Sequence, residues 1–297
     1  MKKYDLIIIG GGVAGLTSAI YALRGGLKVL LIEKYMIGGQ SVNANEITNY
    51  PGFVSISGAE LGLTIHKQAE LLGLETEYDE VISVDLKNKI ISTKSSQFKS
   101  LCIVLSMGAK SRKLNLKNEE SFTGRGVHYC ATCDGNFYKN KNVVVVGGGN
   151  TAIEESIYLS NICKKVTLVC RKPILSGQKL LVDKLEKNRK VEIIYNQEVK
   201  ELIVDDVLKG VKLTNNQMID TDAIFIAIGR DPNTELINNQ LKLNNGYIVA
   251  DENMHTDIEG VFVAGDVRVK NLRQLATAIG DGAIAGTEAS KYVNERR

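Results

Sequence analysis

The chain has 297 residues, of which 44% are apolar, enough to fill the cores of two ordinary globular domains. Its 37 basic and 34 acidic residues leave a net charge of +3 without any basic block, so the charge pattern does not predict binding to nucleic acid or to a membrane. Five cysteines, an odd number, argue against the disulfide framework of a secreted domain.

The chain opens with a short apolar segment. The β-branched run from Asp5 ends at Gly10, which makes it too short for the core of a signal peptide or for a membrane span. We therefore predict a buried strand at this position. Together with the cysteine count, this predicts a cytoplasmic protein, in which a disulfide is usually catalytic or regulatory.

A glycine-rich turn follows this strand. Gly10, Gly12 and Gly15 form the pattern G-x-G-x-x-G ahead of a predicted helix over residues 16–24, and the next predicted strand ends at Glu33. Such glycines close the turn, let the backbone approach a pyrophosphate and let the helix pack on the strand, while the helix N-terminus offers N–H groups to the phosphates. Glu33 is spaced to accept hydrogen bonds from the hydroxyls of a ribose. The alternative is a glycine-rich turn that binds nothing.

Two cysteines, Cys130 and Cys133, are separated by two residues and precede Asp134. Two such thiols can close a small disulfide ring, and the neighbouring carboxylate can exchange a proton with a thiolate. The alternative, half of a zinc site, needs two more sulfur or imidazole ligands, and the sequence has no second Cys-x-x-Cys and no His-x3-His spacing. The pattern therefore favours a redox pair. His128 lies close enough in sequence to tune a thiol pKa, although spacing alone does not establish contact.

The pattern of the first module is repeated in the middle of the chain. A predicted strand from Asn142 leads into the glycine-rich turn 147–152, a helix through Leu159 and a strand over residues 165–169. Two related nucleotide-binding folds are therefore predicted in one chain.

The second module differs from the first at the position of Glu33. Its counterpart there is Cys170, followed by Arg171 and Lys172. An acid would repel a 2′-phosphate whereas these cations would attract one, so the second site favours NADP over NAD. The alternative is that both cations are ordinary solvated residues at the end of a strand.

Other segments complete the two modules. Residues 101–108 and 223–229 are predicted to be buried strands that end on a glycine, one in each module. Residues 77–91 and 191–213 alternate between apolar and polar, which predicts antiparallel strands that form an additional layer.

The C-terminal segment carries a further strand and a helix. The strand over residues 260–265 ends at Asp266, and the helix that follows Arg273 and Gln274 is rich in small residues. Small residues on a helix usually indicate close packing between elements, and here we favour close packing against a flat cofactor. The segment is predicted to return to the first module, which makes residues 113–241 an insertion.

In combination these motifs resemble those of the bacterial-type, low-molecular-weight thioredoxin reductases of the pyridine nucleotide-disulfide oxidoreductase family, and the resemblance runs from end to end. The motifs that carry it are 10–15 with Glu33, 38–40, 49–52, 130–135, 147–155, 265–266 and 273–274. The resemblance implies an α/β fold of two Rossmann-like, three-layer domains, the second inserted into the first. Residues 1–112 and 242–297 would bind FAD, and residues 113–241 would bind NADPH and carry the redox disulfide.

The resemblance also implies roles for individual residues. For FAD these residues are Gly10, Gly12, Gly15, Glu33, Gly39, Gln40, Asn49, Asp266, Arg273, Gln274 and Ala276. For NADPH they are Gly147, Gly149, Asn150, Thr151, Ala152 and Glu155, with Arg171 and Lys172 at the 2′-phosphate. By the same analogy Cys133 meets the flavin, Cys130 attacks the disulfide of thioredoxin, and Asp134 protonates the leaving thiolate. A homodimer is implied, as is a swing of the inserted domain on hinges near 114–117 and 241–245.

One position departs from the family pattern. The family commonly has His-Arg-Arg followed three residues later by another Arg, whereas this chain has Cys170, Arg171, Lys172 and then Ser176. Lysine is a weaker partner for phosphate than arginine, so NADPH affinity is expected to be low, or the donor to be a ferredoxin-type carrier. Further alternatives are a glutaredoxin-like or peroxiredoxin-linked partner, and a non-catalytic flavoprotein that senses redox state.

Overall fold

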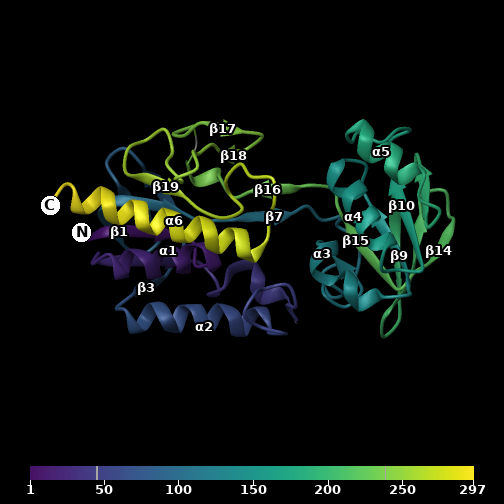
Figure 1. The fold of residues 1–297 in the computed structure, drawn as a ribbon, viewed down its shortest axis with the longest axis horizontal. Coiled ribbons are helices and arrows are strands. Elements are labelled where there is room, and N and C mark those ends of the chain that lie inside the picture. The colour runs from purple at the N-terminus through teal and green to yellow at the C-terminus, as the bar shows by residue number, and fades with distance from the viewer. Residues whose placement is uncertain (45, 238) are drawn as a thin grey trace. The chain divides into compact units, whose positions relative to one another are not determined.

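The computed structural model describes residues 1–44, 46–237 and 239–297. Their contacts divide the chain into two compact units, residues 1–110 with 231–297 and residues 111–230. The chain passes between the units at β7 (Ala109–Ser111) and β16 (Arg230–Pro232), which pair with each other (Figure 1). The second unit is therefore an insertion into the first, and the predicted fold class is confirmed.

The first unit is built on a seven-stranded sheet in the order β3-β2-β1-β6-β5-β4, with β19 beside β6. The pairs among β1, β2, β3, β6 and β19 are parallel, and β4 and β5 continue the sheet in antiparallel fashion. Its strands are β1 (Lys2–Ile9), β2 (Val29–Glu33), β3 (Glu75–Tyr78), β4 (Val81–Asp85), β5 (Ile90–Thr93), β6 (Gln97–Leu105) and β19 (Val261–Val263).

The α-helices of this unit are α1 (Val13–Arg24), α2 (Gly58–Leu71) and α6 (Leu275–Asn294), and they cover the sheet. Shorter elements lie in the loops: the 3-10 helices η1 (Gly39–Asn43) and η3 (Glu235–Ile237), and the hairpin of β17 (Leu243–Asn244) and β18 (Tyr247–Ile248). Figure 1 shows α6 lying along α1. Within the described residues no helix has the length and apolar character needed to span a bilayer.

The small residues of α6 serve a different purpose from the predicted one. A side chain at Gly282 or Gly286 would stand 2.3 Å from the carbonyl oxygen of Ala14 or Ser18 in α1. The prediction that small residues of α6 pack against a cofactor is therefore wrong for these two glycines. Their lack of a side chain instead allows α6 to approach α1.

The second unit repeats the arrangement with a five-stranded parallel sheet in the order β11-β10-β9-β15-β8 and a separate three-stranded antiparallel sheet. The strands are β8 (Val127–His128), β9 (Asn142–Val146), β10 (Lys165–Cys170), β11 (Val191–Tyr195), β12 (Val199–Val204), β13 (Leu208–Leu213), β14 (Met218–Asp220) and β15 (Ala223–Ile226). The helices are α3 (Ala131–Asp134), η2 (Gly135–Tyr138), α4 (Asn150–Ser160) and α5 (Lys179–Glu186).

Two strands predicted to be antiparallel are parallel. β3 and β11 each form the edge of a main sheet, beside β2 and β10. An edge strand of a parallel sheet leaves part of its length uncovered, so its sequence does not show the continuous apolar run of a central strand. The antiparallel layers begin after these strands.

The unit boundaries differ from positions 113 and 241. Residues 231–241 belong to the first unit, where Ile237 and Leu241 are buried in its core and the side chain of Gln240 bonds to the backbone of β4 and Leu86. The segment 114–117, predicted to be a hinge, is held inside the second unit. The connections between the units fall instead at β7 and β16.

Candidate active site

A disulfide joins Cys130 and Cys133 in the second unit. Cys130 is the N-cap of the one-turn helix α3, and its carbonyl accepts from the N–H of Asp134 at 3.1 Å. The Cα atoms of the two cysteines lie 5.3 Å apart across this turn. Because the two sulfurs are bonded to each other, the pair is in the oxidised form of a dithiol and not in the thiolate form that binds zinc.

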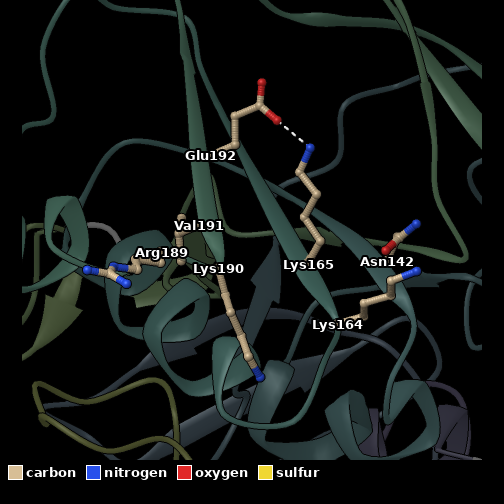
Figure 2. A pocket seen from close by; sticks show the side chains of 7 residues that line it. All are labelled: Asn142, Lys164, Lys165, Arg189, Lys190, Val191 and Glu192. Carbon is tan, nitrogen blue, oxygen red and sulfur yellow. Dashed lines mark ion pairs between the residues drawn. The ribbon is translucent and has the colours of Figure 1, made fainter.

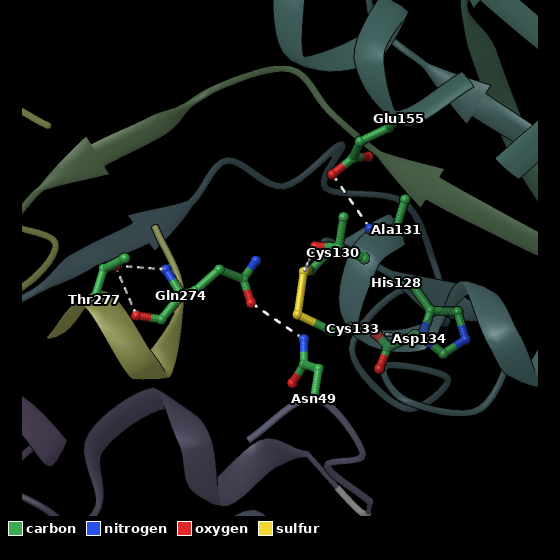
Figure 3. Close-up of a disulfide and its surroundings, with 10 residues drawn as sticks. Asn49, His128, Cys130, Ala131, Cys133, Asp134, Glu155, Gln274 and Thr277 are labelled. Atoms are coloured by element: carbon green, nitrogen blue, oxygen red, sulfur yellow. Dashed lines mark hydrogen bonds and ion pairs between the residues drawn. A yellow bond between two sulfur atoms is a disulfide. The ribbon is translucent and has the colours of Figure 1, made fainter. Parts of the chain in front are cut away.

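The carboxylate of Asp134 is held by a buried histidine. Its Oδ2 lies 2.9 Å from Nδ1 of His128, and Nε2 of the same ring lies 2.7 Å from the hydroxyl of Tyr138. Figure 3 shows the carboxylate turned toward the imidazole. The sequence spacing did not establish whether His128 contacts the cysteine pair. In the structure its ring contacts the carboxylate of Asp134, which follows Cys133 in the chain.

Glu155 on α4 contacts the same helix from the other side. Its Oε1 accepts from the N–H of Ala131 at 3.2 Å, while Oε2 is buried and has no hydrogen-bond partner among the described residues (Figure 3). Burial raises the pKa of this carboxyl from its ordinary 4.5 to about 7, against the lowering effects of the Ala131 amide and the Arg230 charge. Glu155 is therefore a group that titrates near neutrality, next to the disulfide helix.

The first glycine-rich turn has three distinct environments. Gly10 has φ +104°, and a side chain there would stand 2.5 Å from the carbonyl oxygen of Ser106. A side chain at Gly15 would meet the carbonyl oxygen of Gly10 at 2.1 Å. At Gly12 the nearest atom is the Cα of Gly39 at 4.0 Å, so the backbone there is open. Gly10 and Gly15 are thus needed for the turn itself, and Gly12 leaves room for a phosphate.

Glu33 lies at the end of β2 beside this turn. Its Oε2 accepts from the N–H of Gly11 at 2.6 Å and its Oε1 accepts from the N–H of Tyr35 at 2.8 Å. These two bonds fix the carboxylate at the edge of the turn. A carboxylate has about four acceptor sites, so lone pairs remain for the hydroxyls of a ribose.

The second glycine-rich turn repeats this arrangement with one substitution. A side chain at Gly147 would stand 2.4 Å from the carbonyl oxygen of Ala227, whereas one at Gly149 would meet nothing within 4 Å. Fully buried Ala152 occupies the place of Gly15. The side chain of Asn150 is already engaged, since its Oδ1 accepts from the N–H of Gln178 at 2.7 Å. Thr151 follows at the exposed start of α4.

The residue in place of Glu33 is a buried thiol. Cys170 is 2% exposed, and its Sγ would be 2.6 Å from a side chain at Gly148. The next two residues, Arg171 and Lys172, are exposed. The end of this strand therefore presents positive charge and no acid.

A contact between the turn and the loop after the second strand is common to both modules. The N–H of Gly38 donates to the carbonyl of Gly11 at 2.8 Å, and the N–H of Ser176 donates to the carbonyl of Gly148 at 2.7 Å. Sequence reasoning missed this role of Ser176, because it compared that position with an arginine of the family pattern. The available signal was that Ser176 follows the second glycine-rich turn at nearly the same sequence distance at which Gly38 follows the first.

The other residues predicted for the flavin lie in loops of the first unit. The amide of Gln40 donates to the carbonyl of Ala109, and Nδ2 of Asn49 donates to Oε1 of Gln274 at 3.3 Å (Figure 3). The guanidinium of Arg273 lies 4.2 Å from the centre of the Tyr247 ring.

Asp266 and Ala276 complete this predicted set. The carbonyl of Asp266 accepts from Nε of Arg273 at 3.5 Å, so this loop and the start of α6 are joined. Ala276 lies in the first turn of α6 and is exposed.

A buried ion cluster that the sequence did not reveal holds the loop around Asp266. Asp281 on α6 is 6% exposed and accepts from Arg268 through both carboxylate oxygens at 2.9 Å, from Nζ of Lys270 at 2.8 Å and from the N–H of Gly265 at 3.1 Å. Burial opposes ionisation of Asp281, yet the two cations hold the pKa of its carboxyl below the ordinary value. The only sequence signal was an acid in an otherwise apolar helix face.

A cavity of about 460 Å³ lies at the end of the second unit's parallel sheet that is farther from the glycine-rich turn (Figure 2). It is lined by Asn142, Lys164, Lys165, Arg189, Lys190, Val191 and Glu192. Because β9, β10 and β11 begin here, the cavity is at the amino ends of the strands, whereas the glycine-rich turn is at the carboxyl end of β9. None of the predicted site residues lines it.

Two glycine-rich nucleotide turns and a disulfide on a one-turn helix define a nucleotide-dependent disulfide oxidoreductase. The chain belongs to the pyridine nucleotide-disulphide oxidoreductase family, whose model matches residues 4–282. It is therefore an oxidoreductase that uses a flavin and a pyridine nucleotide.

Individual relatives are similar over almost the whole chain. The thioredoxin reductase of Listeria monocytogenes is 43% identical, with 99% of this chain and 95% of that protein covered. That of Bacillus subtilis is 40% identical, with 99% and 96% covered. The crystal structure of thioredoxin reductase from Streptococcus pyogenes has a TM-score of 0.93 at 39% identity and covers 99% of both chains.

Proposed function

We propose that this chain is a thioredoxin-disulfide reductase that passes electrons from NADPH through FAD to the Cys130–Cys133 disulfide and on to the disulfide of thioredoxin. The observation that carries the proposal is the disulfide on α3, in a chain with two nucleotide-type glycine turns. The relatives named thioredoxin reductase, which match almost the full length, support the choice of thioredoxin as substrate.

The first unit is proposed to hold FAD. The open backbone at Gly12 fits the pyrophosphate, and Glu33, fixed at the edge of the turn, fits the ribose. Gly10 and Gly15 shape this turn. The other contacts are assigned to the loop residues Gly39, Gln40, Asn49, Asp266, Arg273, Gln274 and Ala276.

The second unit is proposed to hold NADPH. The open backbone at Gly149 fits the pyrophosphate at the N-terminus of α4, where the turn residues Gly147, Asn150, Thr151 and Ala152 shape the site. Glu155, one turn further along α4, is assigned to the nicotinamide end.

The preference for NADPH over NADH rests on the end of β10. Buried Cys170 presents no negative charge to a 2′-phosphate, and exposed Arg171 and Lys172 attract one. The family match does not favour a ferredoxin-type donor, because the family is named for a pyridine nucleotide.

When bound, the two cofactors supply the electron pair that reduces the disulfide. The chain supplies the positions and the protons. Cys133 is proposed to face the flavin, and Cys130 to attack the disulfide of thioredoxin. Asp134 is proposed to exchange the proton with the sulfur that leaves as a thiolate, since it directly follows Cys133 on the same helical turn.

Other parts of the proposal come from the sequence, where the family resemblance implies a homodimer and the cysteine count with the short N-terminal apolar run predicts a cytoplasmic protein. A homodimer in the cytoplasm is the assembly and location that we propose. A glutaredoxin-like or peroxiredoxin-linked partner would use the same dithiol chemistry, and no contact in the described residues favours it. The sensor alternative is not favoured either, because the named relatives are reductases.

The donor is tested by anaerobic mixing. The FAD-loaded protein is mixed with NADPH or with NADH, and bleaching of the flavin's visible absorbance is followed. Fast bleaching by NADPH and slow bleaching by NADH is the expected result. Bleaching by neither, with dithionite still effective and the resulting dithiol still reducing thioredoxin, would mean that the nucleotide assignment of the second unit is wrong.

The disulfide is tested with Cys133→Ser. This variant should bind FAD and reduce ferricyanide, which takes electrons without the cysteine pair, but should not reduce thioredoxin. Cys130→Ser is the matched comparison: both variants lose turnover, but only Cys133→Ser should trap thioredoxin as a mixed disulfide through Cys130. Normal thioredoxin turnover in either variant would refute the scheme.

A further inference from the structure

His128 is a buried histidine with both ring nitrogens engaged. It is the last residue of β8, is 3% exposed, and stacks on the fully buried ring of Phe225 with centroids 5.2 Å apart and planes at 27°. Its Nδ1 faces Oδ2 of Asp134 and its Nε2 faces the hydroxyl of Tyr138. Both nitrogens of any buried imidazole need a partner, so what distinguishes His128 is the identity of its two partners. It joins the acid beside the disulfide to a tyrosine.

The direction of the hydrogen bonds follows from the chemistry of the three groups. Burial and the nearby charges of Asp134 and Asp222 raise the pKa of Tyr138 to about 12, so its hydroxyl is protonated in the neutral range and can donate. In neutral imidazole one nitrogen donates and the other accepts. Donation from Tyr138 to Nε2 therefore leaves the proton on Nδ1, which donates to Oδ2 of Asp134.

The other carboxylate oxygen is left available. All the hydrogen bonds that the described residues make to the Asp134 side chain are at Oδ2, and the side chain retains 23% exposure. A fixed Oδ2 restricts rotation of the carboxyl group. Oδ1 can then carry the proton that the sulfur receives.

We propose that His128 is the positioning residue for Asp134, donating from Nδ1 to Oδ2 so that Oδ1 exchanges the proton with the cysteine sulfur. The inference rests on the proposed role of Asp134 as the acid. Reduction of the S–S bond by the electron pair that the cofactors would supply leaves two sulfur anions, and one takes the proton from Oδ1 as the carboxyl becomes a carboxylate. The bond from Nδ1 strengthens as that charge develops, because a hydrogen bond to an ionised acceptor is stronger than one to a neutral acceptor.

The surroundings of His128 define which groups enter its pH dependence. Asp134 on α3 and Tyr138 on η2 contact the ring directly, and Phe225 on β15 contributes no charge. The charge of Asp134 contributes to the raised pKa of Glu155 on α4, and Asp222 ahead of β15 contributes to the raised pKa of Tyr138. The pH profile of a His128 variant must therefore be compared with the pH profiles of variants in which these neighbouring groups are substituted.

Four variants of the FAD-loaded protein test the inference. His128→Phe keeps a flat ring against Phe225 but removes both nitrogens, and His128→Asn keeps an amide donor near the position of Nδ1. Tyr138→Phe removes only the hydroxyl, and Asp134→Asn removes the acid itself. For each, kcat and KM for thioredoxin are measured from pH 5.5 to 9.5 with NADPH, and ferricyanide reduction reports on fold and cofactor.

The expected result is a loss in His128→Phe of about tenfold to a hundredfold in kcat with KM nearly unchanged. This is less than the roughly hundredfold to ten-thousandfold contribution of a general acid, because the acid itself remains. The alkaline limb of its pH profile should move to higher pH, because the ionised carboxylate of Asp134 no longer receives the hydrogen bond from Nδ1 of His128. His128→Asn should recover most of the rate, and Tyr138→Phe should lose less than His128→Phe.

Two outcomes overturn the inference. If Asp134→Asn is slow while His128→Phe has the normal rate and profile, Asp134 needs no positioning. If both His128 variants are equally slow with an unshifted profile, the histidine is structural only. A third outcome, a normal rate in Asp134→Asn, would show that Asp134 is not the acid. The inference about His128 would then fall with it, while the proposed thioredoxin reductase activity would stand.

Discussion

The buried carboxyl of Glu155 makes the second unit less stable as the pH rises. Its pKa is raised from 4.5 to about 7, chiefly by burial. A pKa difference of one corresponds to about 1.36 kcal/mol between the two protonation states, so the difference between 4.5 and 7 corresponds to about 3 kcal/mol. Glu155→Gln removes the ionisation but keeps an oxygen that can accept from the N–H of Ala131.

The sign follows from proton counting. Between the unfolded pKa of 4.5 and the folded pKa of about 7, the folded protein holds a proton that the unfolded chain has lost. The contribution to the free energy of unfolding is therefore fully present below pH 4.5 and lost as the pH rises through 7. The wild type should lose stability across this range relative to Glu155→Gln, whose amide does not titrate.

Urea unfolding at pH 5 and at pH 8.5, followed by circular dichroism on the oxidised protein, measures the effect. Glu155→Gln should be favoured by about 2.5 kcal/mol more at pH 8.5 than at pH 5, whatever constant cost the amide adds in place of the buried Oε2, because a small part of the effect is already present at pH 5. Glu154→Gln is the matched control, because Glu154 is the exposed neighbour on the same helix and its charge makes the smallest of the contributions to the raised pKa of Glu155, so the pH dependence should stay nearly unchanged. Parallel curves for Glu155→Gln and the wild type would refute the reasoning.

Four further substitutions test the glycine-rich turn of the first unit and the buried charges of both units. Gly12→Ala should fold normally yet bind FAD weakly, while Gly15→Ala should lose about 1–3 kcal/mol because its side chain would meet a backbone oxygen at 2.1 Å; flavin titration and urea unfolding separate the two. Asp281→Asn should cost up to about 3–5 kcal/mol, because Arg268 and Lys270, whose side chains are 17% and 6% exposed, lose the carboxylate between them. The wild-type contribution should fall away in acid as the pH drops through the lowered pKa of Asp281, visible in thermal unfolding. Glu119→Gln should cost about 1–3 kcal/mol in urea, since its 2% exposed carboxylate accepts from two backbone amides of the segment 114–117 and from the hydroxyl of Tyr129.

The features predicted best from the sequence were those that a local backbone requires. The positive φ of Gly10, the open backbone at Gly12 and the tight packing at Gly15 follow from a strand, a tight turn and a helix within a few residues. The same holds for Gly147 and Gly149. The pairing of Cys130 with Cys133 was also local.

The features missed depend on contacts between distant segments. The glycines at 282 and 286 pack on α1, which no pattern within α6 distinguishes from packing on a ligand. The return of the chain to the first unit at residue 231, before the predicted 241, depends on where Ile237 is buried. Edge strands β3 and β11 were assigned to the wrong layer because burial on an edge is set by the neighbouring strand.

The comparison of the two modules explains how one turn geometry can serve two nucleotides. In the first, Glu33 is fixed at the edge of the turn by the amide of Gly11. In the second, Cys170 lies buried beneath Gly148 at the same position, so no carboxylate reaches the edge of the turn. Removal of a repelling charge discriminates between ligands as effectively as addition of an attracting one, since specificity is a difference of affinities. The loss of the acid therefore contributes to the proposed preference for NADPH even where Lys172 is a weaker phosphate partner than arginine.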